Sequence, residues 1–177
     1  PDPYALLGTA FHDWVQRFYG AERLFDLDDL PGAGDPQTAD IEQLGVLQDA
    51  FTASAWAVRT PLDVEVPFEL VLGETVIRGR IDAVFPDPDG GVTVVDWKTG
   101  EPPTDDRACR SAAVQLAVYR LAWAGLAARP PEQVRAAFHY VRTGETVAPP
   151  QLHSADELEA LLGGCSEEYL RVADVVT

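Results

Sequence analysis

The chain has 177 residues, of which 46% are apolar and 24% are charged, a balance that suits one folded domain and excludes disorder over the whole length. Its formal charge of −16 at pH 7 argues against a general affinity for nucleic acid or anionic membranes, while leaving room for a small basic site. No run approaches the ~18 apolar residues of a transmembrane helix and no signal peptide is visible, so we expect a cytoplasmic protein without membrane contact.

The first part of the chain predicts two helices separated by a loop. Apolar residues between Leu7 and Phe18 recur at helical spacing, which predicts a helix over residues 4–23. Residues 25–40 are acidic and contain several Gly and Pro, which predicts a flexible surface loop. A second helical pattern covers residues 41–58 and ends before a Thr-Pro pair.

The pattern then changes to that of strands. Three segments of β character separated by turn residues predict an antiparallel meander, and a helix and a fourth strand follow it. In order, these segments cover residues 64–70, 75–85, 92–99, 107–128 and 134–142. Ser154 and Glu157 have the spacing of a capping box and begin a last helix. The order of helices and strands predicts an α/β fold with a mixed sheet flanked by helices.

The segment over residues 92–99 contains two charges where a buried strand should be apolar. Its Val-rich run is typical of a strand buried on both faces, yet it includes Asp96 and Lys98. Residues two apart point to the same face of a strand, so these two charges lie together. An unpaired carboxylate in an apolar interior costs several kcal/mol, and an internal ion pair between Asp96 and Lys98 is one way to avoid that cost.

The preceding strand supplies a second explanation. If the hairpin between the strands pivots on Asp89, Asp82 lies directly opposite Asp96. Opposed like charges destabilise a sheet unless a cation lies between them, and Mg²⁺ and Mn²⁺ prefer carboxylate oxygens. Two acids beside Lys98 therefore predict a metal site suited to phosphodiester hydrolysis. The metal would lower the pKa of a bound water, and the lysine would orient that water or stabilise charge on phosphorus.

Several other functions lack their motifs in this sequence. There is no GxxxxGK[ST] phosphate loop, so we expect no ATP binding, and there is no GxSxG serine site. Cys109 and Cys165 lie far apart and form no C-x-x-C pair, which suits a reducing cytoplasm. Four cysteine ligands are not available, so we expect no iron–sulfur cluster.

Four short motifs, taken together, resemble those of the PD-(D/E)XK nucleases. The sequence GRID ending at Asp82, followed by DWKTG beginning at Asp96, resembles the active-site signature of that family. The sequence QLAVY beginning at Gln115 resembles the Q-x-x-x-Y motif of the RecB-like branch, and GTAFH ending at His12 resembles its upstream histidine motif. The resemblance spans residues 8–119 and implies the αβββαβ core of restriction endonucleases.

The resemblance implies a role for each matched residue. The metal ligands would be His12, Asp82, Asp96 and the backbone carbonyl of Trp97, and the catalytic group would be Lys98. Two residues on the following helix, Gln115 and Tyr119, would brace the site or touch DNA.

Other residues have weaker claims. Glu65 resembles an acid on the first strand of the family, and Arg80 shares a strand face with Asp82, where it either contacts phosphate or forms a structural salt bridge. His139 and His153 match no motif, and we take both as non-catalytic.

The resemblance also implies a setting for the domain. RecB-like nuclease domains occur at the C-terminus of UvrD/Rep-type superfamily 1 helicases of the RecB, AddA and Adn type. We therefore expect residues 1–177 to be one nuclease domain, a fragment of a larger helicase-nuclease. It would use Mg²⁺ or Mn²⁺ to cut single-stranded DNA, as an exonuclease or endonuclease, in double-strand-break repair and recombination. The rival hypothesis is an inactive DNA-binding or scaffolding module of a helicase complex, which the intact set of motif residues disfavours.

Overall fold

The computed structural model describes residues 2–20 and 41–163, and the predicted acidic loop at residues 25–40 lies outside these ranges. The helices are α1 (Pro3–Gly20), α2 (Ile41–Thr52), η1 (Ala55–Val58), α3 (Asp106–Leu126), η2 (Pro131–Gln133) and α4 (Ala155–Gly163). The strands are β1 (Asp63–Leu72), β2 (Thr75–Pro86), β3 (Val92–Lys98), β4 (Val134–Tyr140) and β5 (Glu145–Val147). The predicted order of two helices, three strands, a helix, a strand and a last helix is confirmed, and β5 and the short helices η1 and η2 are additional to it.

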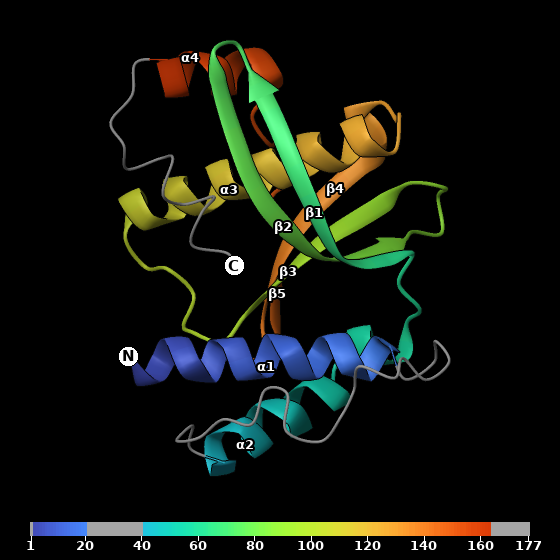
Figure 1. Ribbon diagram of the computed structural model, residues 1–177, viewed down its shortest axis with the longest axis vertical. Coiled ribbons are helices and arrows are strands. Elements are labelled where there is room, and N and C mark those ends of the chain that lie inside the picture. The colour runs from blue at the N-terminus through green and yellow to red at the C-terminus, as the bar shows by residue number, and fades with distance from the viewer. Residues whose placement is uncertain (1, 21–40, 164–177) are drawn as a thin grey trace.

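The strands form one mixed sheet in the order β1-β2-β3-β4-β5. The β1–β2, β2–β3 and β4–β5 pairs are antiparallel, and β3 and β4 are parallel, with α3 as the crossover between them. Figure 1 shows α3 crossing the sheet, with α1 and α2 at one end of the molecule and α4 at the other. The parallel pair brings the carboxyl ends of β3 and β4 to the same edge, where Lys98 lies opposite Tyr140.

Two groups of buried apolar side chains hold the layers together. The α3 cluster joins α3 and α4 to one side of the sheet and includes Ile81, Val94 and Leu116. The α1 cluster joins α1 and α2 to the other side and includes Phe11 and Trp97. Because both sides of β3 are covered, its residues are buried almost throughout, as the Val-rich sequence predicts.

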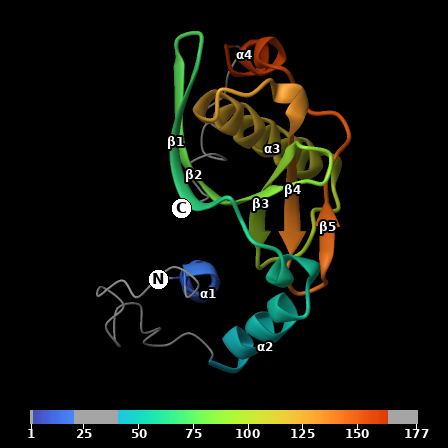
Figure 2. The same ribbon diagram turned by 90° about the vertical axis from the view of Figure 1, so that its right-hand side faces the viewer.

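The long β1–β2 hairpin changes the layer against which it packs. On β2, Ile81 belongs to the α3 cluster and Ala83 to the α1 cluster, although residues two apart on a regular strand share a face. On β1, Val64 and Val66 change sides in the same way, on either side of Glu65, whose φ of +50° is left-handed. Figure 2 shows the hairpin extending past the other strands beside α3. The bend places Glu65 and Asp82 at the boundary between the two clusters.

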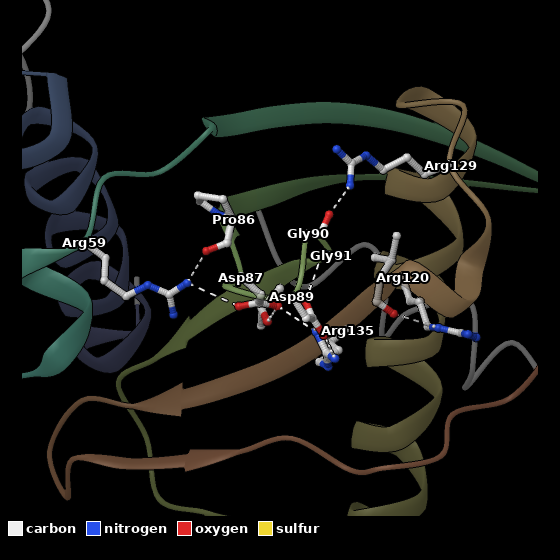
Figure 3. Close-up of polar contacts among 11 residues, drawn as sticks. Arg59, Pro86, Asp87, Asp89, Gly90, Gly91, Arg120, Arg129 and Arg135 are labelled. Carbon is white, nitrogen blue, oxygen red and sulfur yellow. Dashed lines mark hydrogen bonds and ion pairs between the residues drawn. The ribbon is translucent and has the colours of Figure 1, made fainter.

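The loop between β2 and β3 is held by a network of charges (Figure 3). Asp87 lies at its centre, with Oδ1 3.3 Å from Arg59 and Oδ2 3.0 Å from Arg135. Arg135 also pairs with Asp89, whose Oδ1 accepts a 2.9 Å hydrogen bond from the backbone of Gly91. These contacts tie the hairpin loop to the chain before β1 and to the start of β4, and they fix the β2–β3 register at its turn.

The remaining element predictions differ from the structure in two places. The helix predicted over residues 41–58 ends at Thr52, and the chain continues as the short η1 helix, where Trp56 is buried against the α1 cluster. Strand β5 was not expected, because three residues show no periodicity.

The capping box is confirmed: the Glu157 amide donates to Ser154 Oγ at 3.2 Å, and the Ser154 amide donates to Glu157 Oε1 at 3.3 Å. No described helix has the length and apolar character needed to cross a membrane.

Candidate active site

The β2–β3 register brings Asp82 and Asp96 together, as predicted. The ladder pairs Val84 with Val94 and Ala83 with Val95, and one further step in the same register places Asp82 opposite Asp96. Both side chains are buried, with 5% and 2% of their surfaces exposed. Two buried carboxylates therefore lie side by side on neighbouring strands.

Beyond the last backbone pair of β2 and β3, the Asp82 side chain accepts a hydrogen bond from the β3 backbone. Its Oδ2 accepts a 2.8 Å hydrogen bond from the backbone N–H of Trp97. The Trp97 ring points to the opposite side of the strand and packs in the α1 cluster. The carboxylate of Asp82 is therefore fixed to the backbone of β3 between Asp96 and Lys98.

Helix α1 contributes His12 to the same site. The Nδ1 atom of His12 lies 2.7 Å from the carbonyl oxygen of Gly8, one helical turn earlier, and a carbonyl can only accept, so Nδ1 carries the proton. The other ring nitrogen, Nε2, lies 3.3 Å from Asp82 Oδ2. In the neutral ring this arrangement leaves the Nε2 lone pair directed at the acids, which is the tautomer that a metal ligand requires.

These three side chains fit a divalent cation. One ligand atom from each of His12, Asp82 and Asp96 lies within 4.8 Å of the other two. Both oxygens of Asp96 are buried and accept no hydrogen bond from any residue in the described ranges. A buried carboxylate without hydrogen bonds is costly, and a bound cation would supply the missing partner. One nitrogen and several carboxylate oxygens are suitable ligands for Mn²⁺, and the oxygens also suit Mg²⁺.

The electrostatics of the site favour a positive charge between the acids. Burial lowers the pKa of His12, but the Asp82 carboxylate outweighs it and raises the pKa to about 10. Burial raises the pKa of Asp96 to about 7, and repulsion from Asp82 adds to this effect while Lys98 opposes it. Burial also acts to raise the pKa of Asp82, but His12 overcomes it, and the pKa falls below its usual value. Without a metal, the proton on His12 provides the positive charge that the acids require.

Lys98 lies on the other side of Asp96 and is held by three groups. Its Nζ is 3.0 Å from Asp96 Oδ2, which is an ion pair without hydrogen-bond alignment, and 3.5 Å from Gln115 Oε1. It also lies 4.8 Å from the centre of the Phe138 ring. Gln115 in turn donates to the hydroxyl of Tyr119 at 3.1 Å, one helical turn along α3. Of the two Q-x-x-x-Y residues, Gln115 therefore contacts the lysine and Tyr119 contacts Gln115.

Glu65 and Arg80 lie at the edge of this group. Continuation of the β1–β2 register places Glu65 opposite Asp82, so three acids form one row across three strands. Burial raises the pKa of Glu65 to about 7, and the Asp82 carboxylate contributes. The Nη1 atom of Arg80 lies 3.6 Å from Glu65 Oε2. This contact corresponds to the salt-bridge alternative for Arg80, and a phosphate contact stays a prediction.

The residues expected to be non-catalytic lie elsewhere. His139 is buried between Trp56 and Trp97, with Nδ1 2.9 Å from Thr146 Oγ1. His153 belongs to no described metal group. The residue that sequence reasoning missed is Phe138, which pairs with Asp96 across the parallel strands and lies under Lys98. The only signal for it was its place in the apolar pattern of β4.

Comparison with known proteins decides the family. A family model of the PD-(D/E)XK nuclease superfamily matches residues 1–175. The chain belongs to the PD-(D/E)XK nuclease superfamily. Among solved structures, this superfamily member is similar to a candidate exonuclease from Eubacterium rectale, with 14% identity, 99% of this chain and 68% of that chain covered, and a TM-score of 0.56. No curated protein matches the chain.

A second solved protein, SSO0001, is similar at 16% identity, with 98% of this chain and 73% of that chain covered; its TM-score of 0.39 carries no argument. The likeness to the Eubacterium protein shows the fold alone, because the identity is low. For a member of the PD-(D/E)XK nuclease superfamily, the five-stranded mixed sheet flanked by helices is the expected restriction-endonuclease-like architecture.

Proposed function

We propose that this chain is a Mg²⁺- or Mn²⁺-dependent deoxyribonuclease domain. The observation that carries the proposal is the buried Asp96 carboxylate, which accepts no hydrogen bond in the described part of the chain and lies within ligand distance of Asp82 and His12. A structural ion pair with Lys98 needs only one acid, whereas a cation site uses both acids and the histidine. A bound metal would polarise a phosphoryl oxygen and lower the pKa of a water that attacks phosphorus. The carbonyl of Trp97 would complete the ligand set.

The side chains of this protein would divide the remaining work. His12 and the two acids would hold the cation, and the Gly8 carbonyl would keep the His12 ring in the required tautomer. Lys98 would orient the water and stabilise negative charge on the phosphoryl group. Gln115 would keep the ammonium group in place, and Tyr119 would hold the Gln115 amide.

The choice of amino acid at position 98 supports this role. Lys98 is the only lysine of the chain, which also contains twelve arginines. A pure salt bridge to Asp96 would suit arginine, which binds carboxylates through two parallel hydrogen bonds. Lysine is a compact charge that can release a proton when its surroundings require it. A lysine in a chain that otherwise uses arginine therefore favours a chemical role.

The test is cleavage of a 5′-labelled single-stranded oligonucleotide. We expect products with Mn²⁺ or Mg²⁺, none with EDTA, and none with Asp82→Asn, because that change removes a proposed ligand. The control is Asp49→Asn, which removes an exposed acid of α2 and should cleave at the wild-type rate. A wild-type chain that binds the oligonucleotide but leaves it uncut with either metal would support the rival, a non-cleaving DNA-binding or scaffolding module.

We further infer that single-stranded DNA reaches this domain from an attached superfamily 1 helicase motor of the RecB-like type, in a cytoplasmic DNA-repair enzyme. The RecB-like motifs at His12 and Gln115 support the setting. The charge of −16 supports the need for delivery, because a polyanion binds where cations outnumber acids. We expect the separate domain to cut slowly and its intact parent to cut much faster at the same salt and metal. Equal rates would contradict the dependence on a motor but not the nuclease.

A further inference from the structure

An open pocket of about 490 Å³ lies beside Lys98, and most of the residues that line it have no role in the site described above. It lies at the carboxyl ends of β3 and β4, against the first half of α3. In sheets with parallel strands this is the edge at which ligands commonly bind. The volume falls within the range of about 300–1,000 Å³ that is typical of small-molecule sites.

The lining of the pocket has an aromatic and apolar part. Phe138 and Tyr140 contribute it from β4, and Ala108 and Ala112 contribute it from α3. Tyr140 is only 4% exposed and forms part of the pocket wall. A flat ring with polar edges would fill such a space, because it can contact the apolar walls and also pair with polar groups of the lining.

The polar part of the lining is divided by charge. Lys98 and Arg107 are the cations of the pocket, and Glu101 and Asp105 are acids on its exposed rim. The first turn of α3 is not itself the anion site, because Asp105 caps the helix by accepting a 2.8 Å hydrogen bond from the Ala108 amide. A ligand with one anionic group would therefore direct that group to Lys98 and away from the rim.

We infer that this pocket holds one nucleoside unit of the DNA strand, adjacent to the phosphate that Lys98 contacts. The inference rests on the proposed function, since it places the substrate relative to the proposed catalytic lysine. The base would contact Tyr140 and the small residues of α3, and base–aromatic contact of this kind accepts any base. A pocket of this volume has room for one nucleoside, which an unpaired base of single-stranded DNA could supply.

The test compares three small phosphodiesters with the same leaving group. Methyl p-nitrophenyl phosphate has no nucleoside, whereas the p-nitrophenyl esters of thymidine 5′-phosphate and thymidine 3′-phosphate carry one on either side. In each case water adds to phosphorus, and p-nitrophenolate leaves with the electron pair of the broken P–O bond. With Mn²⁺ and the full chain, we expect kcat/KM for at least one thymidine ester to exceed that for the methyl ester about tenfold or more, the equivalent of about 1.4 kcal/mol.

A substitution that fills the pocket provides the second arm. Ala108→Trp should lower the preference for thymidine to less than about threefold, because the indole would occupy the place of the base. The matched control is Leu126→Trp at the far, exposed end of the same helix, which should keep the wild-type preference. Equal kcat/KM values for all three esters, or a preference that survives Ala108→Trp, would overturn the pocket assignment alone. Failure to hydrolyse any of the three would overturn the nuclease proposal, and the pocket assignment with it.

Discussion

Replacement of Asp96 by asparagine should make the metal-free protein more stable. The carboxylate is 2% exposed and lies beside Asp82, and the cost of its burial exceeds what its ion pair with Lys98 returns, so its charge opposes folding when no metal is bound. Asparagine has nearly the same shape and removes the charge. A residue that is needed only for ligand binding often carries such a cost to stability.

The size of the effect follows from the pKa of Asp96. A change from 3.8 in the unfolded chain to about 7 in the fold corresponds to about 4 kcal/mol, since each pKa unit is worth 1.36 kcal/mol. Because the pKa of Asp96 is higher in the folded state, the wild-type protein keeps this contribution of about 4 kcal/mol to the folding free energy below pH 4 and loses it as the pH rises through 7. The buried amide of asparagine also has a desolvation cost, so the expected gain at pH 8 is about 2–3 kcal/mol, or ~5–10 °C in Tm.

The assay is thermal unfolding in EDTA between pH 4 and pH 8, for wild type and Asp96→Asn. Asp96→Asn should be about 1–2 kcal/mol less stable than wild type at pH 4, and its relative stability should rise by about 4 kcal/mol with pH and level off above pH 7. The control is Asp89→Asn on the same hairpin: Arg135 lowers the pKa of Asp89 to about 2, so this variant should lose stability at neutral pH. An Asp96→Asn protein less stable than wild type at pH 8, or a difference independent of pH, would refute the reasoning.

Three further outcomes test other parts of the molecule. Lys98→Arg should lower the cleavage rate about 10²-fold or more yet keep the rise in Tm that Mn²⁺ causes, because the lysine is not a proposed ligand; near-normal cleavage would reduce its role to charge alone. His12→Ala should weaken Mn²⁺ binding in calorimetry about 10–100-fold while His153→Ala does not, and equal effects would make His12 structural. Ser154→Ala should remove one half of the capping box and lower the free energy of unfolding by about 1 kcal/mol, without changing the cleavage rate; an unchanged Tm would show that the cap contributes nothing.

The pairing of Asp82 with Asp96 was predictable because local chemistry determines the hairpin. Pro88, Asp89 and Gly90 form a three-residue loop centred on Asp89, Gly90 has the positive φ that such a loop requires, and the register of the flanking strands follows from where the chain reverses. The contact between Gln115 and Tyr119 was predictable for a similar reason, since residues four apart share one face of a helix.

The bend of the β1–β2 hairpin could not be predicted in the same way. It depends on two separate layers, one under each half of the hairpin, and the sequence pattern reports only that a position is apolar, not which layer covers it. The left-handed backbone of Glu65 has no sequence signal either, because glycine is the residue expected at a positive φ. The position of Phe138 under Lys98 depends on the parallel β3–β4 pairing, which joins segments far apart in the chain.

The hydrogen bond between the Trp97 amide and Asp82 makes the backbone a reporter of the site. An amide proton held by a carboxylate responds to the charge on that carboxylate, and its resonance moves when the acid gains a proton or shares its electrons with a ligand. Occupancy at this centre can therefore be read by nuclear magnetic resonance from one main-chain signal, with no label on any reactive group. Exchange of the same proton with solvent would report how often β2 and β3 separate at this point, before and after a ligand arrives.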